Sequence, residues 1–279
     1  MRVALELTGL TKTFATPSGP FVAVKNVNLR IDPGEFVCIL GHSGCGKSTV
    51  LSIMAGLQRA TEGGVIVDGR EVDEPGLERA VVFQAPCLLP WMSAQDNVRL
   101  AVRRARPALR RRQQDTEAAA YLELAGVADA ARRLPGELSI GTQQCVSMAR
   151  ALALEPRFLL LDEPFSTLDS LTRFELQDTL LRIFHASAHS TRAGDPGSER
   201  RRRIVVMVTH DIDEALYLCD RLVLMTDGPE ARVGETIQVP FPRPRVRAAV
   251  LGHPEYYHYR RRIIDFLENH AGQSRVAAA

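Results

Sequence analysis

The sequence predicts an α/β protein with a largely parallel sheet, and three observations lead to that prediction. Short β-rich runs alternate with helical segments along most of the chain. Five of these runs are continuously apolar, as expected of strands that are covered on both faces. Polar residues follow directly after several of them, where open α/β sheets gather their ligands. The five runs are residues 36–40, 80–83, 158–161, 204–208 and 222–225.

Length and composition set the class of protein. The chain has 279 residues, of which 45% are hydrophobic and 24% charged, so it can bury a substantial core in one large or two modest domains. No apolar run approaches the roughly 18 residues that a membrane span needs, and the N-terminus lacks the apolar region of a signal peptide. We therefore expect a cytoplasmic chain that serves a membrane only through a partner.

Charge and cysteine content exclude several function classes. The net charge of +2 gives no general case for binding nucleic acid. The basic runs at 103–104, 110–112 and 200–203 lack interleaved aromatic residues and are interpreted as solvated faces or loops. The five cysteines are widely spaced without a C-x-x-C pair, so neither a zinc site nor a disulfide framework is predicted.

Shifts in local pattern suggest the domain organisation. Between about residues 90 and 151 the strand signal gives way to Arg- and Ala-rich helical sequence, which predicts a helical subdomain inserted into the sheet domain. Residues 185–203 lack apolar periodicity and are predicted to form an exposed loop. The prolines from 240 to 244 exclude a central strand or a helix interior, and an amphipathic helix is expected around 259–270. The predicted division is therefore residues 1–235 for the main domain and 236–279 for a C-terminal tail.

A phosphate-binding loop follows the first apolar strand. The segment matches the G-x-x-x-x-G-K-[ST] pattern in full. Glycines allow backbone N–H groups to turn inward around phosphate oxygens, Lys47 supplies a charge for the β- and γ-phosphates, and Ser48 supplies a hydroxyl for Mg²⁺. The apolar run 50–57 is expected to begin a helix whose N-terminal dipole favours the anion. The predicted ATP-binding residues of this loop are Gly41, His42, Ser43, Gly44, Cys45, Gly46, Lys47, Ser48 and Thr49.

Four polar residues at strand ends are the candidates for catalysis and metal binding. Asp162 is suited to a Mg²⁺ shell, and Glu163, one residue later, to polarising an attacking water. Gln84 has the length to reach the metal or the water. His210 is interpreted as a contact to the γ-phosphate, although a lone histidine is more often structural. An Asp-Glu pair at the end of a strand is by itself a weak indication of a nucleotide site. Together with the phosphate loop it is a strong one.

These motifs resemble the ATP-binding cassette (ABC) family over about residues 3–235. The resemblance implies a P-loop NTPase (RecA-like) core with an N-terminal antiparallel β region. It also implies that Glu163 is the catalytic carboxylate, that Gln84 is the Q-loop glutamine and that His210 is the switch histidine. Asp169 falls in the segment similar to the D-loop. Phe14 stands where family members stack an aromatic ring on adenine, and a core phenylalanine is the alternative.

The segment 138–144 resembles the ABC signature motif, with departures. The usual form is L-S-G-G-Q, whereas here Ile140 replaces the first glycine, Thr142 replaces the glutamine, and Cys145 stands where an arginine is common. Ser139 and Gly141 remain, and in the family these face the γ-phosphate of ATP held by the opposite subunit. The resemblance therefore implies a second ATPase subunit, identical or homologous, and the departures leave that choice open.

Several further segments are similar to the nitrate/sulfonate/bicarbonate importer group, and most to its nitrate/nitrite/cyanate branch. They are residues 41–46, 88–91, 168–173, 225–229 and 242–245. This resemblance implies transmembrane permease subunits and, indirectly, a solute-binding protein as partners, at the cytoplasmic face of a bacterial inner membrane. The permease is expected to dock near residues 86–98, where 88–91 is apolar; core packing is the alternative for that stretch.

Two other functions remain compatible with the sequence. A soluble ABC ATPase of DNA repair or the ribosome would typically carry a long coiled-coil insertion or two cassettes, and neither is visible. A nucleotide-binding regulatory subunit that hydrolyses ATP weakly is kept open by the altered signature.

Overall fold

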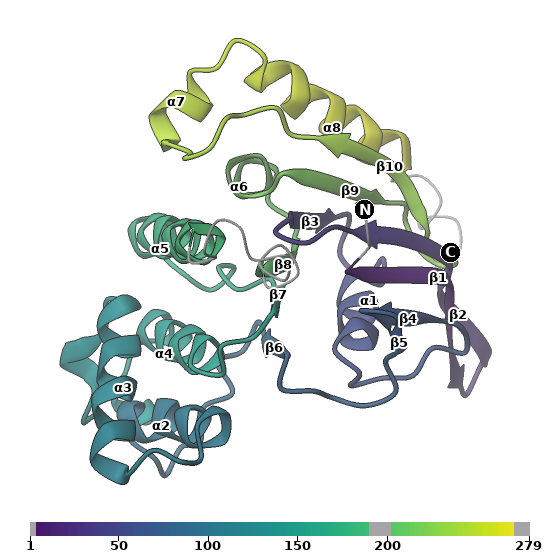
Figure 1. Cartoon of the computed structure of the whole chain (residues 1–279). Helices are drawn as coiled ribbons and strands as arrows, with labels where there is room; N and C mark the ends of the chain where they lie inside the picture. Colours follow the sequence, from purple (N-terminus) through teal and green to yellow (C-terminus); the bar gives the residue numbers. More distant parts are fainter. Residues whose placement is uncertain (1–3, 190–201, 271–279) are drawn as a thin grey trace. The chain divides into compact units, whose positions relative to one another are not determined.

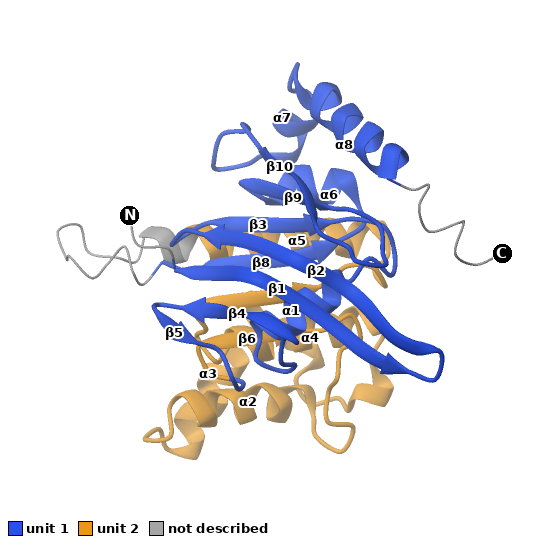
Figure 2. Cartoon of the chain, turned by 90° about the vertical axis from the view of Figure 1, so that its right-hand side faces the viewer, with its two compact units in different colours: residues 1–75, 191–279 blue, residues 76–190 orange. Residues whose placement is uncertain are grey.

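The computed structural model describes residues 4–189 and 202–270, without the side chains of 186–189. The chain divides into two compact units, shown in blue and orange in Figure 2. Unit 1 consists of residues 1–75 and 191–279, and unit 2 of residues 76–190. The boundary between a main domain of 1–235 and a tail of 236–279 stays a prediction.

Unit 1 begins with an antiparallel sheet. Its strands are β1 (Leu5–Thr16), β2 (Gly19–Ile31), β4 (Glu62–Val67) and β5 (Arg70–Glu71), in the order β2-β1-β4-β5 (Figure 1). Only Pro17 and Ser18 separate β1 from β2, so the two strands form a hairpin. This sheet is the antiparallel β region that the resemblance implied.

The parallel strands of unit 1 carry the phosphate loop. They are β3 (Phe36–Leu40), β8 (Ile204–Thr209) and β9 (Arg221–Met225), with β10 (Val233–Gln238) antiparallel to β9 at the edge. β3 lies between β8 and β9 and is parallel to both. All five residues of β3 are buried, as the continuous apolar run predicted. Parallel strands end at the same edge, so the residues after β3 and after β8 lie at one edge of these strands.

The described residues of unit 1 form four helices, namely α1 (Lys47–Met54), α6 (Ile212–Leu218), α7 (Arg247–Leu251) and α8 (Tyr256–His270). α1 begins at Lys47, three residues before the apolar run that was expected to begin it, and it ends at Met54. The reason for the early end is Gly56, which has a φ of 77°. A left-handed glycine just after the last turn stops a helix.

The part of unit 2 that the structure describes contains a parallel strand pair and four α-helices. The strands are β6 (Arg79–Val82) and β7 (Phe158–Asp162). The helices are α2 (Ala94–Ala105), α3 (Arg111–Leu124), α4 (Ile140–Leu152) and α5 (Ser170–His189), with short 3₁₀ turns at Ala128–Ala130 and Pro135–Glu137. α2 packs against α3 and α4, and the apolar face of α2 is buried in that contact.

Two boundaries in unit 2 differ from the sequence-based expectation. The strand expected at 80–83 lies one residue earlier, and Phe83 is outside it and 37% exposed. The loop expected from residue 185 is wrong for its first five residues, because α5 continues to His189. Its last turns contain Ala186 and Ala188, which favour helix without needing an apolar stripe. Residues 190–201 of that expected loop lie outside the described residues.

A search of the described helices finds none that is both long enough and apolar enough to cross a bilayer.

Candidate nucleotide site

The phosphate loop of unit 1 connects β3 to α1, and its glycines adopt conformations that other residues avoid. Gly44 and Gly46 have φ values of 82° and 90°. A Cβ on Gly46 would lie 2.4 Å from Cγ1 of Val24 on β2, so only glycine fits there. Gly46 caps α1 without any side-chain hydrogen bond. The backbone N–H groups at the start of a helix favour an anion, so the loop and the first turn of α1 together favour an anion site on chemical grounds.

Lys47 provides the positive charge of the loop. The residue is only 4% exposed. Its Nζ donates hydrogen bonds of 2.8 Å to the carbonyl oxygens of Gly41 and of His42, so the ammonium lies inside the loop. A buried ammonium surrounded by carbonyl groups favours a counter-anion. These features favour the phosphate site that the motif predicts, and the assignment of the loop residues stays a prediction.

Cys45 lies in the loop, and its side chain is buried against the protein. Burial raises the pKa of its thiol, and the nearby Lys47 ammonium opposes that shift. A Cβ on Gly41 would lie 2.8 Å from Sγ of Cys45, so the thiol packs under the start of the loop. Any contact of Cys45 with a nucleotide would have to come from its backbone N–H.

Most of the other predicted residues of unit 1 are at least partly accessible, whereas Gly41 is buried. Ser43, Gly44 and Ser48 are exposed, and Thr49 is half-buried. His210 is exposed directly after β8, at the edge where the loop follows β3.

Phe14 is half-buried on β1, opposite Phe21 of β2. Nζ of Lys12 lies 5.1 Å from the centroid of the Phe14 ring, which is a cation–π contact. The ring is partly accessible, and its predicted stacking on adenine stays a prediction.

In unit 2 the structure brings Gln84 and Glu163 together. β7 ends at Asp162, and Glu163 follows with a φ of 45°, an uncommon backbone conformation for a residue other than glycine. Nε2 of Gln84 lies 3.5 Å from Oε2 of Glu163 and 3.4 Å from Oγ of Ser166. These are long contacts, and they place an amide beside the candidate catalytic carboxylate.

Gln144 anchors the segment that carries Gln84, a role that sequence reasoning missed. Its side chain is fully buried, and Nε2 donates a 2.9 Å hydrogen bond to the carbonyl oxygen of Phe83. Oε1 of Gln144 has no hydrogen-bond partner within the described residues. The signal in the sequence was its place inside the 138–144 motif.

The altered signature motif still starts a regular helix. Ser139 caps α4, because its Oγ accepts a 3.1 Å hydrogen bond from the N–H of Thr142. The hydroxyls of Ser139 and Thr142 lie 2.9 Å apart and share a further hydrogen bond. Ile140 is 50% exposed and does not disturb the cap. The departures at 140 and 142 therefore leave Ser139 as an ordinary N-cap and Gly141 in a regular first turn.

Asp169 has a structural role of its own. Its Oδ1 accepts hydrogen bonds of 3.1 Å from the N–H groups of Leu171 and Thr172, at the start of α5. Hydrogen bonds from Thr172, together with that from Leu171, lower the pKa of the Asp169 carboxyl. Capping of α5 is a structural role that Asp169 fills without any ligand. Its predicted contact with a nucleotide stays a prediction.

No group of three or more His, Cys, Asp or Glu side chains that could hold a metal occurs in the part of the chain that the structure describes. Mg²⁺ in nucleotide sites is held by one or two protein groups together with phosphates and water. The metal assignment to Ser48, Gln84 and Asp162 stays a prediction.

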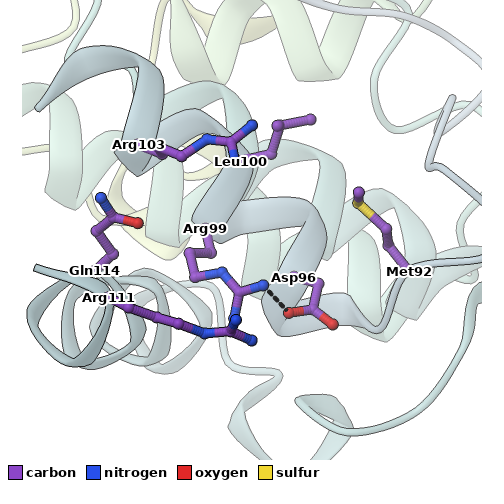
Figure 3. Close-up of a pocket in the computed structure, with 7 residues that line it drawn as sticks. All are labelled: Met92, Asp96, Arg99, Leu100, Arg103, Arg111 and Gln114. Atoms are coloured by element: carbon purple, nitrogen blue, oxygen red, sulfur yellow. Dashed lines mark ion pairs between the residues drawn. The ribbon is translucent and has the colours of Figure 1, made fainter. Parts of the chain in front are cut away.

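A positively charged cavity of about 280 Å³ lies among the helices of unit 2 (Figure 3). Arg99 is paired, with ion pairs of 2.6 Å to Asp96 and 2.8 Å to Asp115. Arg103 and Arg111 have no carboxylate partner among the residues described here, and Arg111 extends from α3 toward Arg99 on α2. The cavity is lined by Met92, Asp96, Arg99, Leu100, Arg103, Arg111 and Gln114.

Curated relatives match nearly the whole chain. The nitrate import ATP-binding protein NrtD of Synechococcus elongatus is 49% identical over 92% of this chain and 88% of its own length. The bicarbonate transport ATP-binding protein CmpD of the same organism is 43% identical over 95% of this chain and 90% of its own length. The nitrate transport protein NasD of Klebsiella oxytoca is 44% identical over 96% of this chain and 97% of its own length.

A solved structure and a family model agree with these relatives. The ATP-binding cassette MJ0796, a dimer in a post-hydrolysis state bound to ADP and Pi, superposes with a TM-score of 0.72 at 32% identity. The match covers 85% of this chain and 100% of that one, and it confirms the P-loop NTPase fold. The family model for the ABC transporter matches residues 24–166. The chain therefore belongs to the ABC transporter family.

Proposed function

We propose that this chain, the ATP-hydrolysing subunit of an ABC importer, energises the uptake of nitrate or a related small anion. The observation that carries the ATPase assignment is the phosphate loop, in which Lys47 is buried and α1 has no side-chain cap. Nitrate is favoured because nitrate and bicarbonate import subunits are 43–49% identical to most of the chain. Nitrite, cyanate and sulfonate are related candidates.

Each proposed catalytic residue has a distinct task. Lys47 binds the β- and γ-phosphates, and the N–H groups of residues 41–49 surround them. Glu163 accepts a proton from the attacking water, with Gln84 and His210 orienting that water and the γ-phosphate. Ser48 and Asp162 would hold Mg²⁺, assisted by Gln84. When bound, Mg²⁺ neutralises charge that develops on the phosphate oxygens.

A second cassette completes the site in this proposal. Ser139 and Gly141 of one chain contact the γ-phosphate of ATP held by the other, and Asp169 lies near the same nucleotide. The position of Ser139 and Gly141 at the N-terminus of α4 supports this, because the helix dipole favours an anion there. The solved cassette is dimeric. Phe14 would stack on the adenine ring. The two chains are identical or homologous.

The experiment that tests the function is reconstitution with the permease subunits and the solute-binding protein in vesicles. We expect ATP hydrolysis to rise when nitrate-loaded binding protein is present, and nitrate to accumulate in the vesicle lumen. If bicarbonate-loaded but not nitrate-loaded binding protein stimulates ATP hydrolysis, the transported solute is bicarbonate and not nitrate. A weakly hydrolysing regulatory subunit would show nucleotide binding without stimulated turnover.

We further propose that residues 86–98 dock a permease subunit at the cytoplasmic face of a bacterial inner membrane. Asn97 is fully buried and hydrogen bonds to the N–H and carbonyl of Leu89 and the carbonyl of Met92. Arg150 holds the carbonyls of Pro86 and Cys87. The segment is therefore firmly held, yet Trp91 is 70% exposed. A fixed backbone with an exposed aromatic side chain favours a protein contact.

The neighbouring arginine cavity suggests the chemistry of that contact. Met92 belongs both to the docking segment and to the cavity. With Arg103 and Arg111 unpaired by any described carboxylate, the cavity suits an acidic side chain on a cytoplasmic loop of the permease.

Reversing one charge should weaken this assembly. We expect Arg103→Glu to reduce co-purification with the permease severalfold, because the glutamate would repel the acidic side chain proposed to enter the cavity. Arg104→Glu is the matched control, since Arg104 is an exposed neighbour that does not line the cavity. The affinity of either variant for ADP should equal that of the original chain. Equal loss of assembly in both variants would contradict a specific role for the cavity.

A further inference from the structure

A hydrogen bond between two side chains of unit 1 joins the phosphate loop to the turn that follows β9. Nδ1 of His42 lies 2.7 Å from Oδ1 of Asp227. The Asp227 side chain is 6% exposed, whereas that of His42 is 41% exposed. In the tautomer that carries its proton on Nδ1, His42 donates this hydrogen bond to the carboxylate, because an ionised carboxylate only accepts hydrogen bonds. The role proposed above for the loop does not use Asp227, and sequence analysis noted it only as part of the segment 225–229, with no role of its own.

His42 is held on its backbone as well as on its side chain. Its carbonyl oxygen accepts a 2.8 Å hydrogen bond from Nζ of Lys47 and a 3.3 Å hydrogen bond from the N–H of Cys45. The position of His42 thus determines where one of the two carbonyl partners of the Lys47 ammonium lies. A side chain that fixes His42 therefore also fixes the resting place of Lys47.

The turn that carries Asp227 is itself rigidly attached. Thr226 and Arg232 close it with two hydrogen bonds, of 2.9 Å between backbones and 3.0 Å to the Thr226 hydroxyl. The N–H groups of Glu230 and Ala231 bond to β2 carbonyls at 2.8 and 3.2 Å. β2 is also the strand whose Val24 faces Gly46.

The same turn borders the loop at a second point. A Cβ on Gly228 would lie 3.7 Å from the carbonyl oxygen of Gly44, which is ordinary van der Waals contact. Residues 226–232 therefore form a wall of the phosphate loop that is anchored on β2, and Asp227 is the side chain of that wall that reaches His42.

We propose that Asp227 is a positioning residue that holds the phosphate loop, through His42, in the conformation that binds a triphosphate. This inference rests on the proposed nucleotide-binding function of the loop. Asp227 contacts no reacting atom, so its loss lowers the fraction of molecules whose loop is ready to bind. A lower competent fraction weakens the apparent affinity in proportion and leaves turnover at saturating ATP unchanged.

The test compares Asp227→Ala and Asp227→Asn in the full chain. We expect Asp227→Ala to weaken ADP binding, measured by calorimetry, about tenfold, as loss of one charge-assisted hydrogen bond predicts. KM for ATP should rise by the same factor in the reconstituted transporter, with kcat unchanged. Asp227→Asn keeps an oxygen acceptor for Nδ1 and should stay within about twofold of the original chain.

A double-variant cycle shows whether Asp227 acts through His42. His42→Ala should weaken ADP binding as much as Asp227→Ala, and the double variant should be no weaker than either. Should Asp227→Ala fail to fold in a thermal melt, His42→Ala and Asp227→Asn still carry the comparison. Additive losses, a fall in kcat at constant KM, or full ADP affinity in His42→Ala would overturn the inference.

Lys47→Ala separates this inference from the function on which it rests. If Lys47→Ala loses ADP binding while Asp227→Ala and His42→Ala keep it, the positioning role is wrong and the nucleotide loop stands. If Lys47→Ala binds ADP as well as the original chain, the proposed function of the loop is wrong.

Discussion

Replacing Glu163 by glutamine is expected to lower ATP turnover about a hundredfold or more, the usual contribution of a general base. The amide cannot accept the proton of the attacking water, yet it keeps the size and hydrogen-bonding reach of the carboxylate. Nε2 of Gln84 lies 3.5 Å from Oε2 of Glu163, and we expect this contact to be retained with the side-chain oxygen of the new glutamine. Phosphate release from the reconstituted transporter measures the effect.

Nucleotide binding provides the control for this variant. Glu163 has no proposed role in holding ATP, so the affinity of Glu163→Gln for ATP should be unchanged. Because bound ATP would no longer be consumed, a stable dimer should accumulate in gel filtration with ATP but not with ADP. Turnover equal to that of the original chain would rule out Glu163 as the catalytic base.

Much of the fold could be predicted because strand burial leaves a direct pattern in the sequence. β3 is buried throughout, so its residues are all apolar and its bounds were predicted without error. Where burial is partial the pattern weakens: Phe83 is apolar but lies outside β6. The end of α5 was missed because alanines favour helix without displaying an apolar face.

The candidate site divides in the same way. Residues proposed to bind a ligand directly, such as Lys47, occur at fixed spacing in a short sequence motif, so they can be predicted from the sequence. Asp227 contacts His42 from 185 positions further along the chain, and a pair so distant has no spacing rule. Gln144 likewise supports Gln84 through a tertiary contact. Residues that position other residues were therefore the ones that sequence reasoning missed.

Gly46→Ala is expected to abolish nucleotide binding at concentrations that saturate the original chain. The new Cβ would lie 2.4 Å from Cγ1 of Val24, and alanine would be held at a φ of 90°. The left-handed conformation alone costs roughly 1–2 kcal/mol, and the overlap forces the loop or β2 to move. Since about 1.4 kcal/mol is a tenfold change in affinity, a displaced loop should lose far more than that.

Gly44→Ala is the matched comparison, because it shares the strained φ without the overlap. Gly44 has a φ of 82°, and its Cβ would meet nothing within 4 Å. It should therefore weaken ADP binding much less than Gly46→Ala. Adding Val24→Ala to Gly46→Ala removes the overlapping methyl group, so the double variant should bind ADP more tightly than Gly46→Ala does. The loss caused by Gly46→Ala should therefore be smaller in the Val24→Ala background than in the original chain. If the two glycine variants bind ADP equally, strain and not the Val24 contact requires glycine at position 46.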